Sequence, residues 1–154
     1  MSKAKLFLVV FLSVLLSNCG SSDEVLTPEQ ENQKIEAYIV AKKLVVTEKT
    51  TSGLRYILTK ANTSGVKVMN GQTISVAYAG RLLTDKQFDA GNFSFVLGSG
   101  GAIEGFDTGI AKMRVGEKAT LIFPSSLGYG SRSQGSDIPA YSPLVFDIEV
   151  VSAK

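Results

Sequence analysis

Hydrophobic and polar residues alternate along short stretches in the second half of the chain. The stretch 73–78 places Ile74, Val76 and Tyr78 on one face, a pattern typical of a half-buried strand. Further strands are expected at 54–58, 118–123 and 144–150. These stretches are short and separated by turn residues, so the pattern predicts a strand-rich domain.

Helical spacing occurs in two places. Ile103, Phe106 and Ile110 follow helical intervals and predict a short helix between the strands. Thr27 to Gln30 has the composition of a helix start, with a threonine cap, a proline and a glutamine that completes a capping box. This N-terminal helix should end near Leu44. Antiparallel strands with one short internal helix favour an α+β domain, with the sheet folded against that helix.

The N-terminal helix, assigned to 27–46, carries a narrow apolar stripe. The stripe is expected to consist of Ile35, Tyr38 and Ile39, extended by the stem of Lys42 and by Val45. It could form a dimer surface, or the helix could pack on its own domain or act as a spacer. We favour a helix that packs on its own domain or acts as a spacer, because about two heptads are short for a coiled-coil dimer.

The first residues have the layout of a secretory signal. Lys3 and Lys5 precede the apolar run Leu6 to Leu16, in which Ser13 is the one polar residue. A transmembrane helix needs about 20 apolar residues, so this run is too short for a permanent anchor. We therefore expect a signal peptide at 1–18.

The segment Leu16 to Cys19 resembles a bacterial lipobox, although Asn18 is larger than the residue usually found before the cysteine. We expect Cys19 to be lipidated and to open a flexible tether at 19–26, because more than one acyl chain gives stable anchoring. Ordinary signal cleavage nearby would instead leave a free thiol. With the lipid, the protein is expected at the bacterial cell envelope, anchored in the membrane at the periplasmic or outer-membrane face.

Composition excludes several kinds of chemistry. The chain has no histidine and one cysteine. Histidine-based triads and zinc sites, an intramolecular disulfide and a thiolate cluster are therefore impossible. Two of the 16 basic residues lie in the leader, which leaves 14 basic residues against 14 acidic ones and no excess charge for nucleic acid. We expect no metal, no cofactor and no nucleic-acid partner.

An ordered series of motifs runs through the second half of the chain. It reads VAYAGRL at 76–82, QFD at 87–89, FSFVLG at 93–98, AIEGFDTGIAKM at 102–113, LGYG at 127–130, IP at 138–139 and LVFDIEV at 144–150. In this order the motifs resemble the FKBP-type peptidyl-prolyl cis/trans isomerases, over roughly residues 53–151. The glycine-rich stretch 98–101 lacks the Lys-Ser/Thr that follows in a phosphate-binding loop, so we assign it no phosphate site.

The resemblance implies an antiparallel β-sheet wrapped around a short α-helix within 47–154, with an apolar, aromatic pocket. The residues that this implies for substrate binding are Tyr78, Phe88, Phe93, Ala102, Phe106, Ile138 and Phe146. Phe106 would form the floor, where many relatives carry tryptophan. The resemblance further implies three catalytic residues. Asp89 would organise Tyr78, Ile103 would offer its backbone amide, and Tyr129 would direct its hydroxyl at a substrate carbonyl.

The activity implied by the resemblance is peptidyl-prolyl cis/trans isomerisation that assists the folding of exported proteins. Its partners would be proline-containing polypeptides, and macrolide immunosuppressants would bind the same pocket. One alternative is a non-catalytic, chaperone-like module that holds proline-containing or apolar segments. Another is a structural lipoprotein with a vestigial fold. A single aromatic residue on a strand is usually a core residue, so the isomerase hypothesis rests on the joint order of the motifs.

Overall fold

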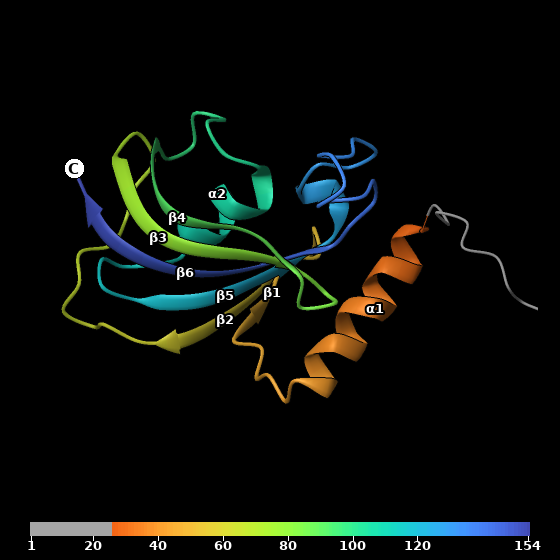
Figure 1. Ribbon diagram of the computed structural model, residues 1–154. Coiled ribbons are helices and arrows are strands. Elements are labelled where there is room, and N and C mark those ends of the chain that lie inside the picture. The colour runs from red at the N-terminus through yellow and green to blue at the C-terminus, as the bar shows by residue number, and fades with distance from the viewer. Residues whose placement is uncertain (1–25) are drawn as a thin grey trace, which may run out of the picture.

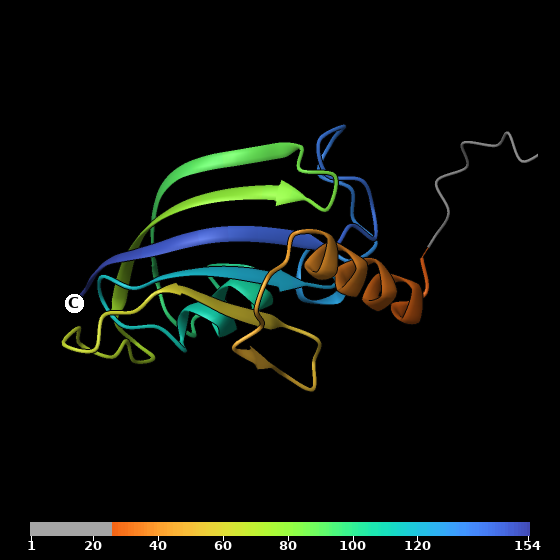
Figure 2. The same cartoon turned by 90° about the horizontal axis from the view of Figure 1, so that it is seen from below.

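Strands dominate the computed structural model of the protein, which describes residues 26–154 (Figures 1 and 2). In this part of the chain, six antiparallel strands form one sheet in the order β1-β2-β5-β6-β3-β4. They are β1 (Glu48–Lys49), β2 (Arg55–Lys60), β3 (Thr73–Leu82), β4 (Gln87–Val96), β5 (Lys118–Phe123) and β6 (Leu144–Ala153). The fold class is α+β, as predicted.

The two central strands, β5 and β6, are buried on both faces. Leu121 and Phe146 point into the main hydrophobic core, whereas their neighbours Ile122 and Val145 belong to a second cluster on the other face. Successive side chains of a strand alternate between faces, so one apolar run can serve two cores. The sheet therefore needs a cover on each side.

The concave side is covered by α2 (Glu104–Ile110), which lies in the hollow of the curved sheet (Figure 1). Its residues Phe106 and Ile110 are buried in the main core, and Ile103 is its N-cap residue. The predicted spacing of these three residues thus marks the helix and its cap. After β5, the chain makes a short 3-10 helix, η1 (Ser125–Leu127), and a loop that returns to β6.

The helix α1 (Pro28–Ala41) begins at the predicted capping box but ends earlier than expected. Thr27 Oγ1 accepts a hydrogen bond from the Gln30 amide at 3.2 Å, and the Gln30 side chain accepts one from the Thr27 amide at 2.7 Å. At the other end, Lys43 has a φ of 54° and the Leu44 amide donates to the Ile39 carbonyl at 3.0 Å. This left-handed ending satisfies the last carbonyls without glycine, so the predicted extension to Leu44 is wrong.

The apolar stripe of α1 packs on the outer face of its own sheet. Ile35, Tyr38 and Ile39 are buried against the second cluster, which also contains Ile57, Ile122 and Val145. The stripe is therefore not a free dimer surface. Val45, expected to extend it, lies beyond the end of the helix and is 81% exposed.

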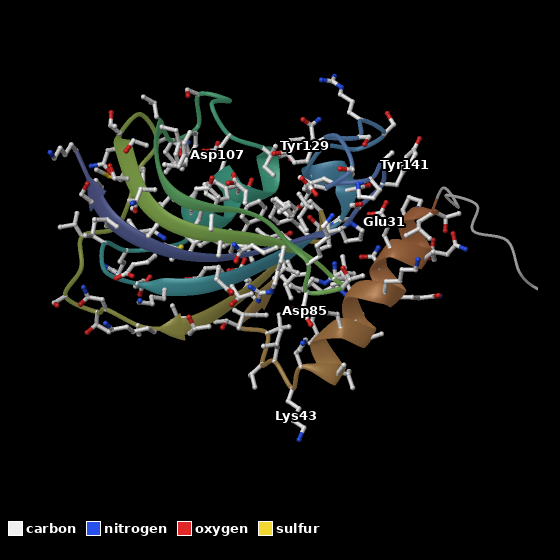
Figure 3. The ribbon with its side chains drawn as sticks, viewed as in Figure 1. Glu31, Lys43, Asp85, Asp107, Tyr129 and Tyr141 are labelled. Atoms are coloured by element: carbon white, nitrogen blue, oxygen red, sulfur yellow. The ribbon has the colours of Figure 1, made fainter. Side chains whose placement is uncertain are left out.

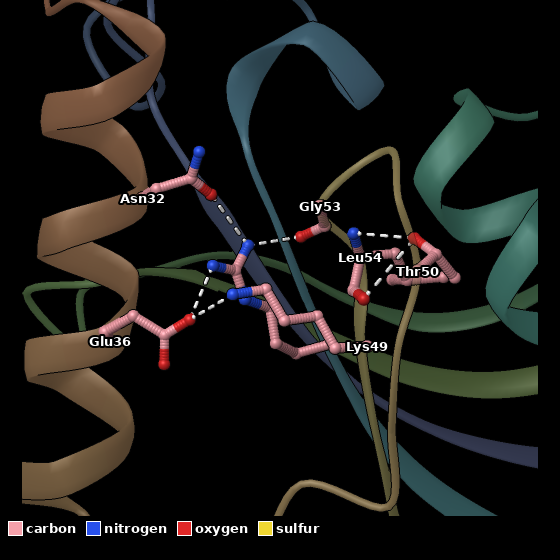
Figure 4. A network of polar contacts seen from close by, with 7 residues as sticks. Asn32, Glu36, Lys49, Thr50, Gly53 and Leu54 are labelled. Carbon is pink, nitrogen blue, oxygen red and sulfur yellow. Dashed lines mark hydrogen bonds and ion pairs between the residues drawn. The ribbon is translucent and has the colours of Figure 1, made fainter.

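A buried arginine ties α1 to the start of β2. Arg55 is fully buried, and its guanidinium donates hydrogen bonds to Asn32 Oδ1 at 3.0 Å and Glu36 Oε1 at 2.7 Å (Figure 4). It also donates to the Gly53 carbonyl. Lys49 donates to Glu36 at 2.8 Å, and the hydrogen bonds from Lys49 and Arg55 lower the pKa of the Glu36 carboxyl. A buried charge is costly without partners, so these acceptors hold α1 in place.

The expected signal peptide, the lipidated Cys19 and nearly all of the tether lie outside the described residues. Between residues 26 and 154, the structure contains no helix with the length and apolar character needed to span a bilayer.

Replacing Ile35 with alanine tests how α1 is held. Ile35 is fully buried, so Ile35→Ala should lower the free energy of unfolding by about 2–5 kcal/mol, as expected for a truncated core isoleucine. The control is Val40→Ala on the same helix, where the side chain is 75% exposed and the expected change is within about 0.5 kcal/mol. Urea unfolding of the folded proteins measures both. Equal losses would contradict packing of α1 on the sheet.

Candidate active site

A pocket of about 410 Å³ opens on the concave side of the sheet. Strands β3, β4 and β6, helix α2 and the loops before α2 and after η1 contribute its walls. The lining residues are Tyr78, Phe88, Asp89, Phe93, Gly100, Gly101, Ala102, Ile103, Phe106, Tyr129 and Phe146. The structure thus brings together every residue expected in the pocket except Ile138.

Aromatic rings form the floor and walls, and they meet mostly edge to face. Phe106 lies 4% exposed at the floor, with its ring centroid 5.2 Å from that of Phe146 at an angle of 77°. Tyr78 meets Phe106 at 5.9 Å and 87°, and Phe88 meets Phe146 at 5.6 Å and 79°. Such pairs are favoured by the ring quadrupoles, so the walls have a defined shape. Phe93, 38% exposed, lies at the rim.

The absence of a side chain at Gly80 makes room for two of these rings. Gly80 lies on β3 opposite Phe146 of β6. A Cβ at this position would come within 2.6 Å of Phe88 Cε2 and 2.7 Å of Phe146 Cε1, closer than real contacts allow. The glycine of the VAYAGRL motif therefore lets both rings approach the sheet.

The polar groups of the pocket centre on Asp89. The Tyr78 hydroxyl donates to Asp89 Oδ2 at 2.5 Å. This hydrogen bond to the carboxylate, together with burial, raises the pKa of Tyr78 to about 12. Burial, and then the charge of Asp89, also raises the pKa of Tyr129. Both phenols therefore keep their protons well above neutral pH and remain hydrogen-bond donors.

The loop before α2 is fixed by contacts that the sequence motifs do not indicate. The Ile103 carbonyl accepts from the amides of Phe106 and Asp107 at 3.0 and 3.1 Å, which orients the backbone at the pocket edge. Asp107 in turn accepts from the Gly98 amide at 3.0 and 3.1 Å. An acidic residue in the first turn of a helix also interacts favourably with the helix dipole. Asp107 therefore ties Gly98 to α2, and the stretch 98–101 contributes Gly100 and Gly101 to the pocket lining.

Ile138 is not among the residues that line the pocket. Its side chain is 6% exposed and belongs to the main core. The Ile138 carbonyl accepts from the Gln134 amide at 2.9 Å, so the loop folds back on itself here. The expectation that Ile138 takes part in substrate binding stays a prediction.

A second, wider hollow of about 780 Å³ lies between α1, the β3–β4 turn and the loop 133–143. Its lining includes Tyr141 as the one aromatic residue, together with three leucines, Lys34 and small, polar and proline residues. The smaller pocket concentrates the aromatic rings around a few polar groups, and it is therefore the better candidate for a ligand site.

Comparisons with known proteins identify the family of the chain. The family described as FKBP-type peptidyl-prolyl cis-trans isomerase matches residues 65–151. The FK506-binding protein 2 of Dictyostelium discoideum is 38% identical over 109 residues, which cover 68% of this chain and 80% of that protein. The chain therefore belongs to the FKBP-type peptidyl-prolyl cis-trans isomerases.

For other relatives, the region that matches this chain is only part of their own length. The FK506-binding protein 4 of Rhizopus delemar is 42% identical over 94 residues, which cover 58% of this chain and 25% of that protein. Among solved structures, FkpA from Escherichia coli aligns with a TM-score of 0.69 at 30% identity, covering 82% of this chain and 60% of that one. The family match begins at Gly65, so α1, β1 and β2 precede it.

The pKa of Tyr78 tests the pairing with Asp89. In Asp89→Asn the phenol loses its charged acceptor, so the pKa of Tyr78 should fall from about 12 toward the usual value of about 10. Spectrophotometric titration of tyrosinate, with Tyr78→Phe identifying the signal, measures the change. Because the folded state holds this proton more tightly, its stabilising effect is complete below about pH 10 and is lost as the pH rises toward 12. An unchanged titration in Asp89→Asn would contradict the pairing.

Proposed function

We propose that this protein accelerates rotation about the peptide bond before proline in exported polypeptides that are folding. The observation that carries the proposal is the pocket, in which the rings of Tyr78, Phe88, Phe106 and Phe146 surround a hollow with Asp89 as its one charged lining residue. Family membership supports the same activity. We further propose that macrolides bind in this pocket, in competition with proline-containing segments.

The chemistry needs no proton transfer. The barrier to rotation, about 18–20 kcal/mol, arises because twisting breaks the resonance of the amide. In the twisted state the carbonyl is less polar than in the planar amide. A water-poor pocket of aromatic rings therefore favours the twisted state over the hydrated planar one, which is the differential binding that catalysis requires. A chain without histidine can perform this reaction.

Two donors would orient the substrate. The Tyr129 hydroxyl, whose pKa is raised further by burial, would donate to a carbonyl of the bound peptide. The backbone amide of Ile103 would donate to a second carbonyl of the peptide. Asp89 would hold Tyr78 in place through the hydrogen bond described above. Each contact positions the peptide while the rings receive the proline.

Isomer exchange on a short Phe-Pro or Leu-Pro peptide, followed by NMR, tests the activity. Phe146→Ala removes a wall and should lower kcat/KM by about tenfold or more, whereas Tyr129→Phe removes one donor and should lower it by roughly two- to fivefold. The matched control is Val151→Ala on the same strand, 55% exposed and outside the pocket lining, which should leave the rate unchanged. A macrolide should inhibit the wild-type protein.

The exchange assay distinguishes three outcomes that would contradict the proposal. A full rate in a folded Phe146→Ala variant would show that the pocket assignment is wrong. Peptide binding without faster exchange in the wild-type protein would support a holding module. Neither binding nor exchange would point to a vestigial fold.

We also propose that the domain acts at the bacterial cell envelope, held by a lipid on Cys19. The support is the charged start, the short apolar run and the cysteine at its end. Uncatalysed isomerisation takes tens to hundreds of seconds, so proteins that fold outside the cytoplasm would gain from a catalyst there.

Changing the cysteine tests the anchor. The full chain, expressed in a bacterium, should partition into detergent and carry acyl chains on Cys19 by mass spectrometry. Cys19→Ser should shift it to the aqueous phase, because hydrophobic anchoring depends on the buried acyl chains, at about 0.8 kcal/mol per methylene. Ser17→Ala serves as the control for a change beside the cleavage site. A mature chain with an unmodified Cys19 would contradict the proposal.

A further inference from the structure

A carboxylate of α1 is buried against the loop that carries Tyr129. The Glu31 side chain is 4% exposed, and its Oε2 accepts a hydrogen bond from the Ser125 amide at 2.6 Å. Its Oε1 accepts one from the Ser125 hydroxyl at 2.7 Å. Figure 3 shows Glu31 on the side of α1 that faces this loop. Both carboxylate oxygens therefore accept hydrogen bonds from Ser125, which lies 94 positions away in the chain.

Ser125 also holds the backbone on either side of Tyr129. Its carbonyl accepts from the Gly128 amide at 2.8 Å and from the Gly130 amide at 2.9 Å. Gly130 has a φ of 58°, a left-handed conformation that glycine adopts without strain. The two amides flank Tyr129, so the position of Ser125 sets the position of the phenol at the pocket.

From these contacts we propose that Glu31 is a positioning residue for Tyr129, acting through Ser125. The proposal rests on the proposed isomerase function for its catalytic consequence. Glu31 lies on the helix that precedes the region matched by the family, so this support for the pocket comes from outside that region. Without the carboxylate, the buried Ser125 amide loses its acceptor, and unsatisfied buried donors destabilise the arrangement that contains them.

The alternative is that Glu31 simply fastens α1 to the domain. Glu36 allows the two to be separated, because it lies on the same helix and fastens it through Arg55 at the start of β2, not through Ser125. Glu31→Gln keeps one acceptor oxygen but removes the charge that strengthens both hydrogen bonds to Ser125. Glu36→Gln makes the same chemical change at the other contact. Fastening alone predicts similar consequences from the two variants.

The first measurement does not depend on activity. Amide hydrogen exchange in Glu31→Gln should show protection at Gly128 and Gly130 reduced by about tenfold, while Glu36→Gln leaves these amides as in the wild type. Ser125→Ala, which keeps the amide contact with Glu31 but loses the hydroxyl, should fall between them and serves if Glu31→Gln does not fold. Unchanged protection in Glu31→Gln, or equal loss in the two glutamine variants, overturns the proposal.

The second measurement is a double-mutant cycle in the peptide exchange assay. Glu31→Gln should lower kcat about three- to tenfold with little change in KM, and this loss should largely disappear in the Tyr129→Phe background. An equal loss in both backgrounds overturns the link to Tyr129. If the wild-type protein shows no activity, the proposed function fails, while the exchange measurement still decides the structural link.

Discussion

The aromatic walls of the pocket are held by the same packing that folds the domain. The Phe146 ring is 5% exposed, stacks on the buried Phe123 ring at 5.8 Å, and meets the Phe106 ring in the pocket floor at 5.2 Å. The rings of Phe146 and Phe106 cannot shift without opening a cavity in the core, and close-packed interiors resist such changes. The pocket is therefore pre-shaped, as a site must be if it favours a twisted peptide bond over a planar one.

The outer helix extends this support to the polar rim. Besides the contact of Glu31 with Ser125, the Tyr38 hydroxyl donates to Asp85 Oδ1 at 2.9 Å in the turn between β3 and β4. That turn leads directly into Phe88 and Asp89. One helix on the convex face thus contacts the segments that carry two sides of the pocket. Its apolar stripe supplies the packing, and its polar residues define where the loops lie.

Features encoded by neighbouring residues could be predicted from the sequence. The capping box at Thr27 and the alternation in β3, β5 and β6 depend on contacts within a few residues, so local pattern suffices. The pocket residues came from the order of the family motifs, because each aromatic residue taken singly is equally consistent with a core position. The path of the loop that carries Ile138 could not be predicted in this way. Ile138 follows a turn whose closure depends on the bond between Gln134 and Ile138, and motif order does not contain that geometry.

The sequence by itself determined the class of fold, the start of α1, the family and most of the pocket lining, since these follow from short-range periodicity and from motifs in a set order. Only the tertiary structure decided that α1 covers its own sheet, that Ile138 turns inward and that Glu31 reaches Ser125. These are contacts between segments far apart in the chain, and a sequence records the two partners of such a contact without recording that folding brings them together.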